Sequence, residues 1–189
     1  MSDLPTVGFP DAAAFAAWLA AEGPESAGAW IRLAKGGAPM LAKPDAIDAA
    51  LCHGWIDGQI ARGADDTHFL TRFTPRTRRS RWSEKNRTRA EQLIAEGRMH
   101  PTGLAAIDAA RVDGRWDAAY PPASSAQVPA DLAAALDAEP AARAFFDTLT
   151  GANRYAILYR IHEARTAGTR AARIAKFVAL CAEGRTVHA

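Results

Sequence analysis

The sequence has few of the features that mark secreted or membrane-spanning proteins. It contains only two cysteines, Cys52 and Cys181, and each lies in an apolar helical pattern, where a free thiol behaves as a small hydrophobic group. The longest apolar runs fall well short of the ~18 residues that a membrane span needs. The N-terminus has no basic segment and is interrupted by Asp3 and Asp11. We therefore expect no signal peptide, no membrane span and a cytoplasmic protein.

Motifs for metals and common cofactors are also missing. No two of the five histidines have a spacing that places them on one face of a helix, and there is no C-x-x-C pair. The chain has no glycine-rich phosphate loop, no dinucleotide-binding turn and no nucleophile elbow. We expect neither a metal site nor a cofactor.

What the sequence does contain is alanine, at roughly a quarter of all residues, and this favours helices. Alternating apolar positions predict a small antiparallel sheet of about three strands, and helical spacing predicts packed helices before and after it. The expected strands are 29–35, 54–62 and 67–75, and the expected helices are 11–21, a second that starts at 45, 83–97, 101–112, 131–138, 140–149, 153–165 and 169–183.

These elements predict an α+β fold followed by a helical C-terminal region. Residues 121–128 hold two prolines and two serines and no charge, which is typical of a linker. We expect an α+β domain over residues 1–120, a linker over 121–128 and a helical region over 129–189.

Positive charge is concentrated in one segment, TPRTRRSRWSEKNRTR, residues 74–89. It has seven basic residues and one acid, a net charge of +6, whereas the whole chain is +2, so the remainder is −4. Such a segment can be a solvated loop, an anchor for acids elsewhere, an anion pocket or a nucleic-acid patch. The mildly basic pI of about 8.7 and the scarcity of nearby aromatics, Phe73 and Trp82 alone, argue against nucleic acid. Pro75 fixes the backbone before Arg76, so we expect Arg76 to point inward to a defined partner and Arg78, Arg79 and Arg87 to be solvated.

The motif GWIDG places Asp57 inside an apolar strand between two glycines, and glycine within a strand often marks a bulge. A carboxylate there either pairs with an arginine as part of the structure or lines a ligand or catalytic site. In either case we expect Asp57 to be hydrogen-bonded to an arginine of the segment 76–81, to Asn86 or to a backbone N–H.

The start of the helix at Ser83 is the other candidate region. Asn86 falls in the apolar series Trp82, Asn86, Ala90, Leu93, so it should face inward and need partners for its amide. It either makes a structural hydrogen bond or converges with Ser80 and Ser83 on a ligand at the helix N-terminus, where free N–H groups attract anions. We expect Trp82, Leu93 and Ile94 to be buried against the sheet.

The runs ALCHGWIDGQ, RFTPRTRRSRWSEKNR and LIAEGRMHPTGLAAIDAARVDGRWD, followed by a C-terminal VPADLAAALDAEPAARAFFDTLTGANRYAILYRIHEARTAGTRAARI, resemble the YdeI/OmpD-associated family, labelled bacteriocin-protection proteins. The resemblance extends from about residue 29 to residue 184. It brings no substrate, cofactor or catalytic residue with it. The sequence departs from the family at His100, where a Thr or Ser would cap the next helix, and within AKGGAPMLAKPD, where members carry a Tyr and acids.

Taken together, these patterns predict a protein associated with bacteriocin or stress protection that binds a small anionic ligand or a protein partner. The candidate binding residues are Asp57, Arg76, Ser80, Trp82, Ser83 and Asn86. The first alternative is an enzyme with Asp57 as general acid or base and Arg76 holding an anionic substrate. The second is nucleic-acid binding through residues 74–89. The sequence leaves the ligand and the oligomeric state open.

Overall fold

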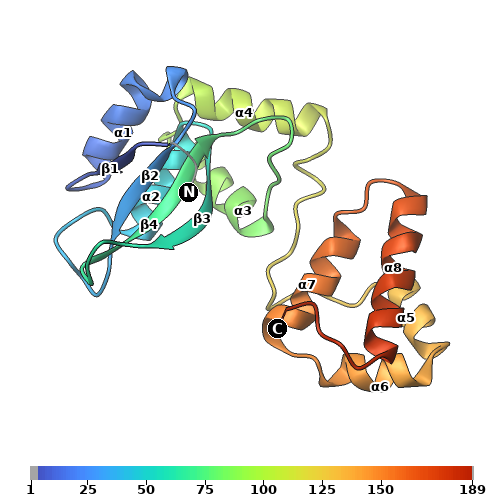
Figure 1. Ribbon diagram of the computed structural model, residues 1–189. Coiled ribbons are helices and arrows are strands. Elements are labelled where there is room, and N and C mark those ends of the chain that lie inside the picture. Colours follow the sequence, from blue (N-terminus) through green and yellow to red (C-terminus); the bar gives the residue numbers. More distant parts are fainter. Residues whose placement is uncertain (1–3, 189) are drawn as a thin grey trace. The chain divides into compact units, whose positions relative to one another are not determined.

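The computed structural model describes residues 4–188, and the chain divides into an N-terminal unit, Met1–Ala119, and a C-terminal unit, Tyr120–Ala189 (Figure 1). The N-terminal unit combines a sheet with helices, and the C-terminal unit is helical. This confirms the α+β class with a helical C-terminal region. In the described part of the chain, no helix combines the length and the apolar character that crossing a membrane would require.

The sheet has four strands rather than three. They are β1 (Thr6–Gly8), β2 (Ala29–Ala34), β3 (Trp55–Arg62) and β4 (His68–Pro75), in the spatial order β1-β2-β4-β3. The three expected strands pair antiparallel, whereas β1 pairs parallel to β2 and makes the sheet mixed. The sequence analysis missed β1 because three residues are too few to show an alternation. The pairing of β3 with β4 shifts between Asp57 and Ile60, so Gly58 lies at a bulge, as the GWIDG motif indicates.

The helices of the N-terminal unit occupy the expected places, although the second begins at Lys43, two residues before its expected start, and has no side-chain cap. They are α1 (Ala12–Ala21), α2 (Lys43–Cys52), α3 (Glu84–Ala95) and α4 (Pro101–Val112), with a short 3₁₀ turn at Gly23–Glu25. The Asp11 carboxylate accepts from the N–H of Ala14 at 2.8 Å, and the Ser83 hydroxyl accepts from the N–H of Asn86 at 3.1 Å. Each side chain satisfies one of the free N–H groups that open a helix.

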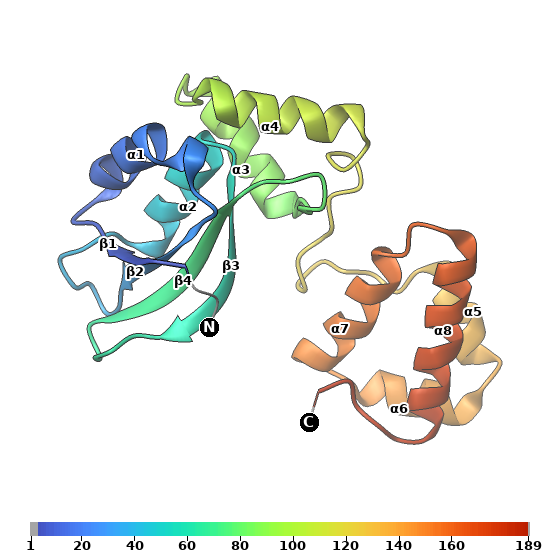
Figure 2. The same cartoon turned by 45° about the horizontal axis from the view of Figure 1, so that its top comes forward.

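Two apolar clusters hold the N-terminal unit together. In the first, Phe15 and Leu19 of α1 and the alanines of α2 pack on one face of the sheet against Ile31 and Phe73 (Figures 1 and 2). In the second, Leu51 of α2, Leu93 of α3 and Ile107 of α4 surround two tryptophans, Trp82 and Trp116.

The second cluster corrects one expectation. Trp82 and Leu93 are 1% and 0% exposed, as expected, but their neighbours are α2 and α4 rather than the sheet, and Ile94 is only half-buried. The first cluster shows that α1 and α2 together pack against the sheet. The helix α3 therefore packs on α2 as a further layer.

The C-terminal unit consists of four helices around a core of its own. They are α5 (Ala130–Asp137), α6 (Pro140–Thr148), α7 (Gly151–His162) and α8 (Ala167–Ala182). Leu136, Phe146, Ile157, Ile161 and Phe177 are among the buried core side chains. Each helix contributes one apolar stripe, because none of these short helices would be stable alone in water.

Candidate functional site

The loop that follows β4 is fastened to the N-terminal unit by Arg76. Its Nε donates to the carbonyl of Trp55 at 3.2 Å, and its Nη1 donates to the carbonyl of Arg81 at 3.0 Å. The guanidinium carbon lies 3.5 Å from the ring centroid of Trp82, a cation–π contact with a side chain that is almost fully buried. The inward orientation expected for Arg76 is thus present, with backbone carbonyls and an indole as partners.

A second arginine that the sequence analysis did not select supports the same loop. Arg115 is buried, and its Nη1 donates to the carbonyls of Thr77 and Ser80 at 3.2 and 3.0 Å. Its Nε contacts the Asp113 carboxylate at 2.8 Å. Because Arg115 lies 35 residues beyond Ser80, no local pattern could have revealed this contact.

The two candidate serines serve the backbone. The Ser80 hydroxyl accepts from the N–H of Thr77 at 2.9 Å and closes a turn, while Ser83 caps α3. Asn86 is half-buried in the first turn of α3, and in the described part of the chain its side-chain amide makes no hydrogen bond. The hydroxyls of Ser80 and Ser83 therefore both bind the backbone in this structure.

Asp57 does not belong to this loop. It occupies β3 opposite Phe73, is half-buried, and within residues 4–188 its carboxylate makes no hydrogen bond and no ion pair. The expected arginine, asparagine or backbone partner is therefore not found. Since β3 is an edge strand with a bulge directly after Asp57, water can reach the carboxylate and take the place of a protein partner.

A hollow of about 350 Å³ opens beside Arg76. It lies between the end of α2, the start of β3 and the first turns of α4, and its described lining residues are Leu19, Gly23, His53, Gly54, Trp55, Pro75, Arg76, Thr102, Ala105 and Ala106. Of the predicted site residues, only Arg76 lines it directly, and Trp82 supports Arg76 from behind. The described lining residues include one arginine and no carboxylate.

Two glycines make this hollow possible by allowing α4 to approach the end of α2. Gly54 has a φ of +75°, and a side chain there would meet the carbonyl of Thr102 at 2.8 Å. A Cβ on Gly103 would meet the carbonyl oxygen of Cys52 at 2.1 Å. Only glycine tolerates such close backbone contacts.

His53 and His100 stack beside the hollow, with ring centroids 4.7 Å apart and planes inclined by 24°. His100 also caps α4, because its Nδ1 accepts from the N–H of Thr102 at 3.4 Å, so the departure from the family pattern at this position leaves the helix with a cap. The Nδ1 of His53 is buried and has no hydrogen-bond partner in the described structure. Burial, and secondarily the neighbouring His100, lowers the pKa of His53.

The depressed pKa of His53 predicts a loss of stability in mild acid. The unfolded chain takes up a proton near the ordinary value of 6.5, whereas the folded protein resists protonation until a lower pH. The free energy of unfolding should therefore be highest above pH 6.5 and should fall as the pH drops toward the folded pKa. Urea titrations of the wild type and His53→Gln at about pH 7.5 and pH 5 measure this effect. A wild-type protein no more acid-sensitive than His53→Gln would show that His53 does not couple to folding.

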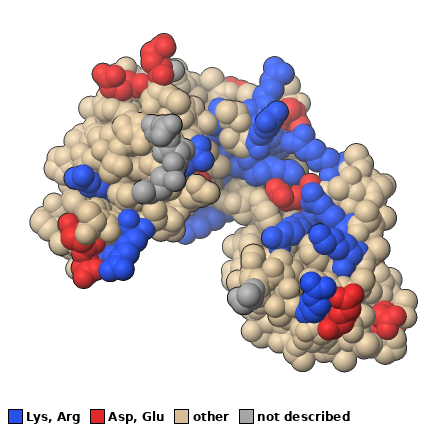
Figure 3. All heavy atoms as spheres, viewed as in Figure 1, with Lys and Arg blue, Asp and Glu red and all other residues tan. Residues whose placement is uncertain are grey.

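The remaining charges of residues 74–89 divide into paired and exposed groups. Arg89 makes a two-pronged contact with Asp48 of α2, at 2.8 and 2.5 Å, and this carboxylate raises the pKa of Arg89. Arg87 donates to the carbonyl of Trp116 at 3.2 Å, which contradicts its expected solvation. The exposed members are Arg78, Arg79 and Lys85. Figure 3 shows that lysine and arginine side chains gather on one side of the N-terminal unit.

Metal ligands are not assembled in the described structure, where no group of three or more His, Cys, Asp or Glu side chains could hold an ion. Cys52 and Cys181 are both free and buried, and burial raises the pKa of each thiol.

Comparison with known proteins finds two families, and each matches residues of a different unit of the chain. Residues 7–106, slightly more than half of the 189 residues, match a family described as a domain of unknown function (DUF8412). Residues 125–184 match the family described as "Bacteriocin-protection, YdeI or OmpD-Associated". No curated protein and no solved structure matches the chain. The GWIDG motif and the basic segment fall in the first match. The second match confirms the predicted resemblance over residues 125–184, not over the whole of the expected range from about residue 29 to residue 184. The chain therefore belongs to the DUF8412 family and carries a YdeI/OmpD-associated region in its C-terminal unit.

Proposed function

We propose that the N-terminal unit binds a small anionic ligand in the hollow beside Arg76. The observation that carries this proposal is the chemistry of the lining: one guanidinium and one imidazole, from Arg76 and His53, with no carboxylate among the described lining residues. A volume of about 350 Å³ is at the small end for ligand pockets, which suits inorganic phosphate, a small carboxylic acid or a phosphate monoester.

Arg76 would supply the charge. Two backbone carbonyls and an indole orient its guanidinium. Thr102 belongs to the first turn of α4, where the helix dipole adds a partial positive charge on the same side as Arg76. His53 would donate an N–H in its neutral form and would gain positive charge at lower pH.

Our proposal also includes a biological setting for this anion binding. The family matched by residues 125–184 is described by bacteriocin protection, so we place anion binding in that context. A cytoplasmic location agrees with two free, buried cysteines, since reduced thiols are typical of reducing compartments.

Filling the hollow should abolish binding. Ala105 is exposed and lines the hollow, whereas Ala109 is equally exposed on the same helix and does not. With inorganic phosphate at about 100 times its Kd, the wild type should gain about 2.7 kcal/mol in unfolding free energy, because the ligand binds only the folded state. Ala109→Trp should keep this gain, and Ala105→Trp should lose it.

The phosphate titration, together with chromatography on single-stranded DNA, separates the alternatives. Stabilisation by phosphate that persists in Ala105→Trp would place the anion elsewhere on the protein. Tight, salt-dependent retention on single-stranded DNA, with no response to phosphate or acetate, would favour nucleic-acid binding through the exposed Arg78 and Arg79 instead.

A further inference from the structure

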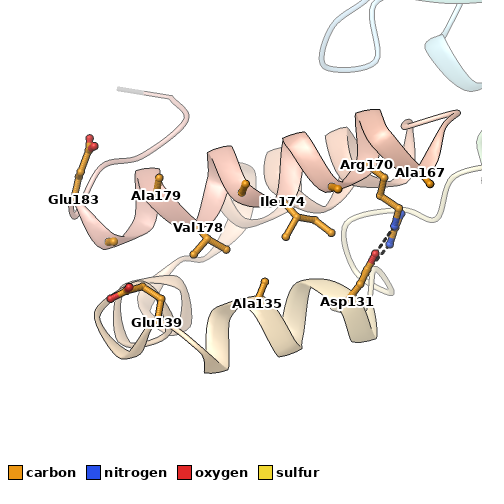
Figure 4. Close-up of a pocket in the computed structure, with 12 residues that line it drawn as sticks. Asp131, Ala135, Glu139, Ala167, Arg170, Ile174, Val178, Ala179 and Glu183 are labelled. Atoms are coloured by element: carbon orange, nitrogen blue, oxygen red, sulfur yellow. Dashed lines mark hydrogen bonds and ion pairs between the residues drawn. The ribbon is translucent and has the colours of Figure 1, made fainter.

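The C-terminal unit has a groove of its own, between α5 and α8, with a volume of about 870 Å³ (Figure 4). Eight of its twelve lining residues are alanine, isoleucine or valine, and the other four are charged. The apolar members are Ala135, Ala167, Ala171, Ile174, Ala175, Val178, Ala179 and Ala182. The apolar part of the groove is therefore larger than one inserted side chain of a partner would fill.

Short side chains create the groove. Ile174 turns into the core, while Ala171, Ala175, Ala179 and Ala182 leave the neighbouring stripe of α8 without bulk and exposed. On the facing wall, α5 buries Leu132 and Leu136 and presents Ala135 to the groove. Alanine walls allow the backbone of another helix to come close, because interaxial distance is set by the side chains at the contact.

The two ends of the groove differ in charge. At one end, Asp131 and Arg170 neutralise each other through bonds of 2.5 and 2.8 Å. At the other end, Glu139 and Glu183 come from opposite walls (Figure 4). Arg185 contacts Glu183 at 2.8 Å, but both side chains are exposed and such surface pairs are weak.

Helix polarity adds to this asymmetry. Asp131 lies in the first turn of α5 and Glu139 follows its last turn, while Arg170 lies in the first turns of α8 and Glu183 follows its end. Both helices therefore direct their C-termini, with partial negative charge, toward the glutamate end. The N-terminus of α6 lies at the same end, directly after Glu139, and offsets the C-terminus of α5. The two glutamates and the C-terminus of α8 therefore make that end the more acidic one.

We propose that this groove docks an amphipathic α-helix of a partner protein, antiparallel to α8, with Lys or Arg side chains at its N-terminal end. In that orientation the positive end of the partner's dipole and its basic side chains meet Glu139 and Glu183, and its apolar stripe meets the alanines. A concave surface needs a convex ridge, so the groove favours a single inserted helix over another groove of the same kind. This site lies in a different unit from the anion-binding hollow and does not depend on it.

Two synthetic peptides of about 15 residues, near the minimum length for a helix in water, test both affinity and orientation. Both carry the same leucine and alanine stripe and the same composition, with blocked termini. One has its lysines in the first turn and the other in the last turn. The full-length chain, labelled with ¹⁵N, should bind the first peptide more tightly, with shifts in the amide signals of α5 and α8.

Matched alanine variants locate the binding. Ala175 lines the groove and Ala172 does not, although both are exposed on α8. Ala175→Trp should weaken binding of the first peptide by about tenfold or more, and Ala172→Trp should leave it within about twofold. Joint Glu139→Gln and Glu183→Gln substitution should remove the preference between the two peptides.

Several outcomes would overturn the proposal. Equal binding of both peptides by the wild type, equal losses in both tryptophan variants, or no amide shifts at millimolar peptide would each do so. A wild-type chain that sediments as a dimer and becomes a monomer in Ala175→Trp would assign the groove to a second copy.

Discussion

Gly103→Ala should destabilise the protein by about 3 kcal/mol, near the upper end of the cost of overpacking a tight contact. The new Cβ would meet the carbonyl oxygen of Cys52 at 2.1 Å and its carbon at 2.7 Å, both part of the backbone. Neither atom can rotate away, so α4 has to move off the end of α2. That displacement would also strain the bond from the N–H of His100 to the same carbonyl, now 3.0 Å long.

Gly168→Ala provides the control. Gly168 lies in the first turn of α8, as Gly103 lies in the first turn of α4, but a Cβ there would meet nothing within 4 Å. Alanine should therefore be neutral or stabilising by up to about 1 kcal/mol, because it lowers the entropy of the unfolded chain. Urea denaturation of both variants gives the comparison. Equal free energies for the two would mean that α4 yields easily, and that the hollow has no fixed shape.

The local rules of helix formation carried most of the fold prediction. Asp11, Ser83 and Pro101 mark three helix starts because each acts through neighbouring residues only. The packing between segments that are far apart in the sequence was harder to predict. The periodicity of α3 shows that Leu93 is buried, but it cannot show that the covering surface is α2 rather than the sheet.

The candidate site shows the same division. The inward orientation of Arg76 could be predicted because Pro75 fixes the backbone before it. The partners of Arg76 could not be predicted, since every residue has a backbone carbonyl and the residue types do not show which ones it binds. His53 was overlooked because its neighbour in sequence, Cys52, points elsewhere, whereas its neighbour in space, His100, is far along the chain. The signal that could have found it is its place directly before GWIDG, at the end of a buried helix.

The basic residues of the segment 74–89 differ in how much they contribute to stability, and their contacts show which of them can be replaced. Arg78 and Arg79 are exposed, and their substitution should stay within about 0.5 kcal/mol. Arg87 is half-buried and donates one hydrogen bond to the carbonyl of Trp116, so Arg87→Ala should cost about 1 kcal/mol, more than its position on α3 suggests.

Arg76→Ala should destabilise the protein by about 2–3 kcal/mol, the sum of two lost charge-assisted hydrogen bonds and a cation–π contact, less the hydration regained. The carbonyls of Trp55 and Arg81 would lose their donor, and the face of Trp82 would lose its cover. Arg76→Lys keeps the charge but not the planar fork, so it should recover less than half of the loss. Urea melts of these variants beside Arg78→Ala measure the difference. Should Arg76→Ala match Arg78→Ala, the guanidinium would be a surface charge like its neighbours, and a hollow whose shape and charge depend on it would lose its support.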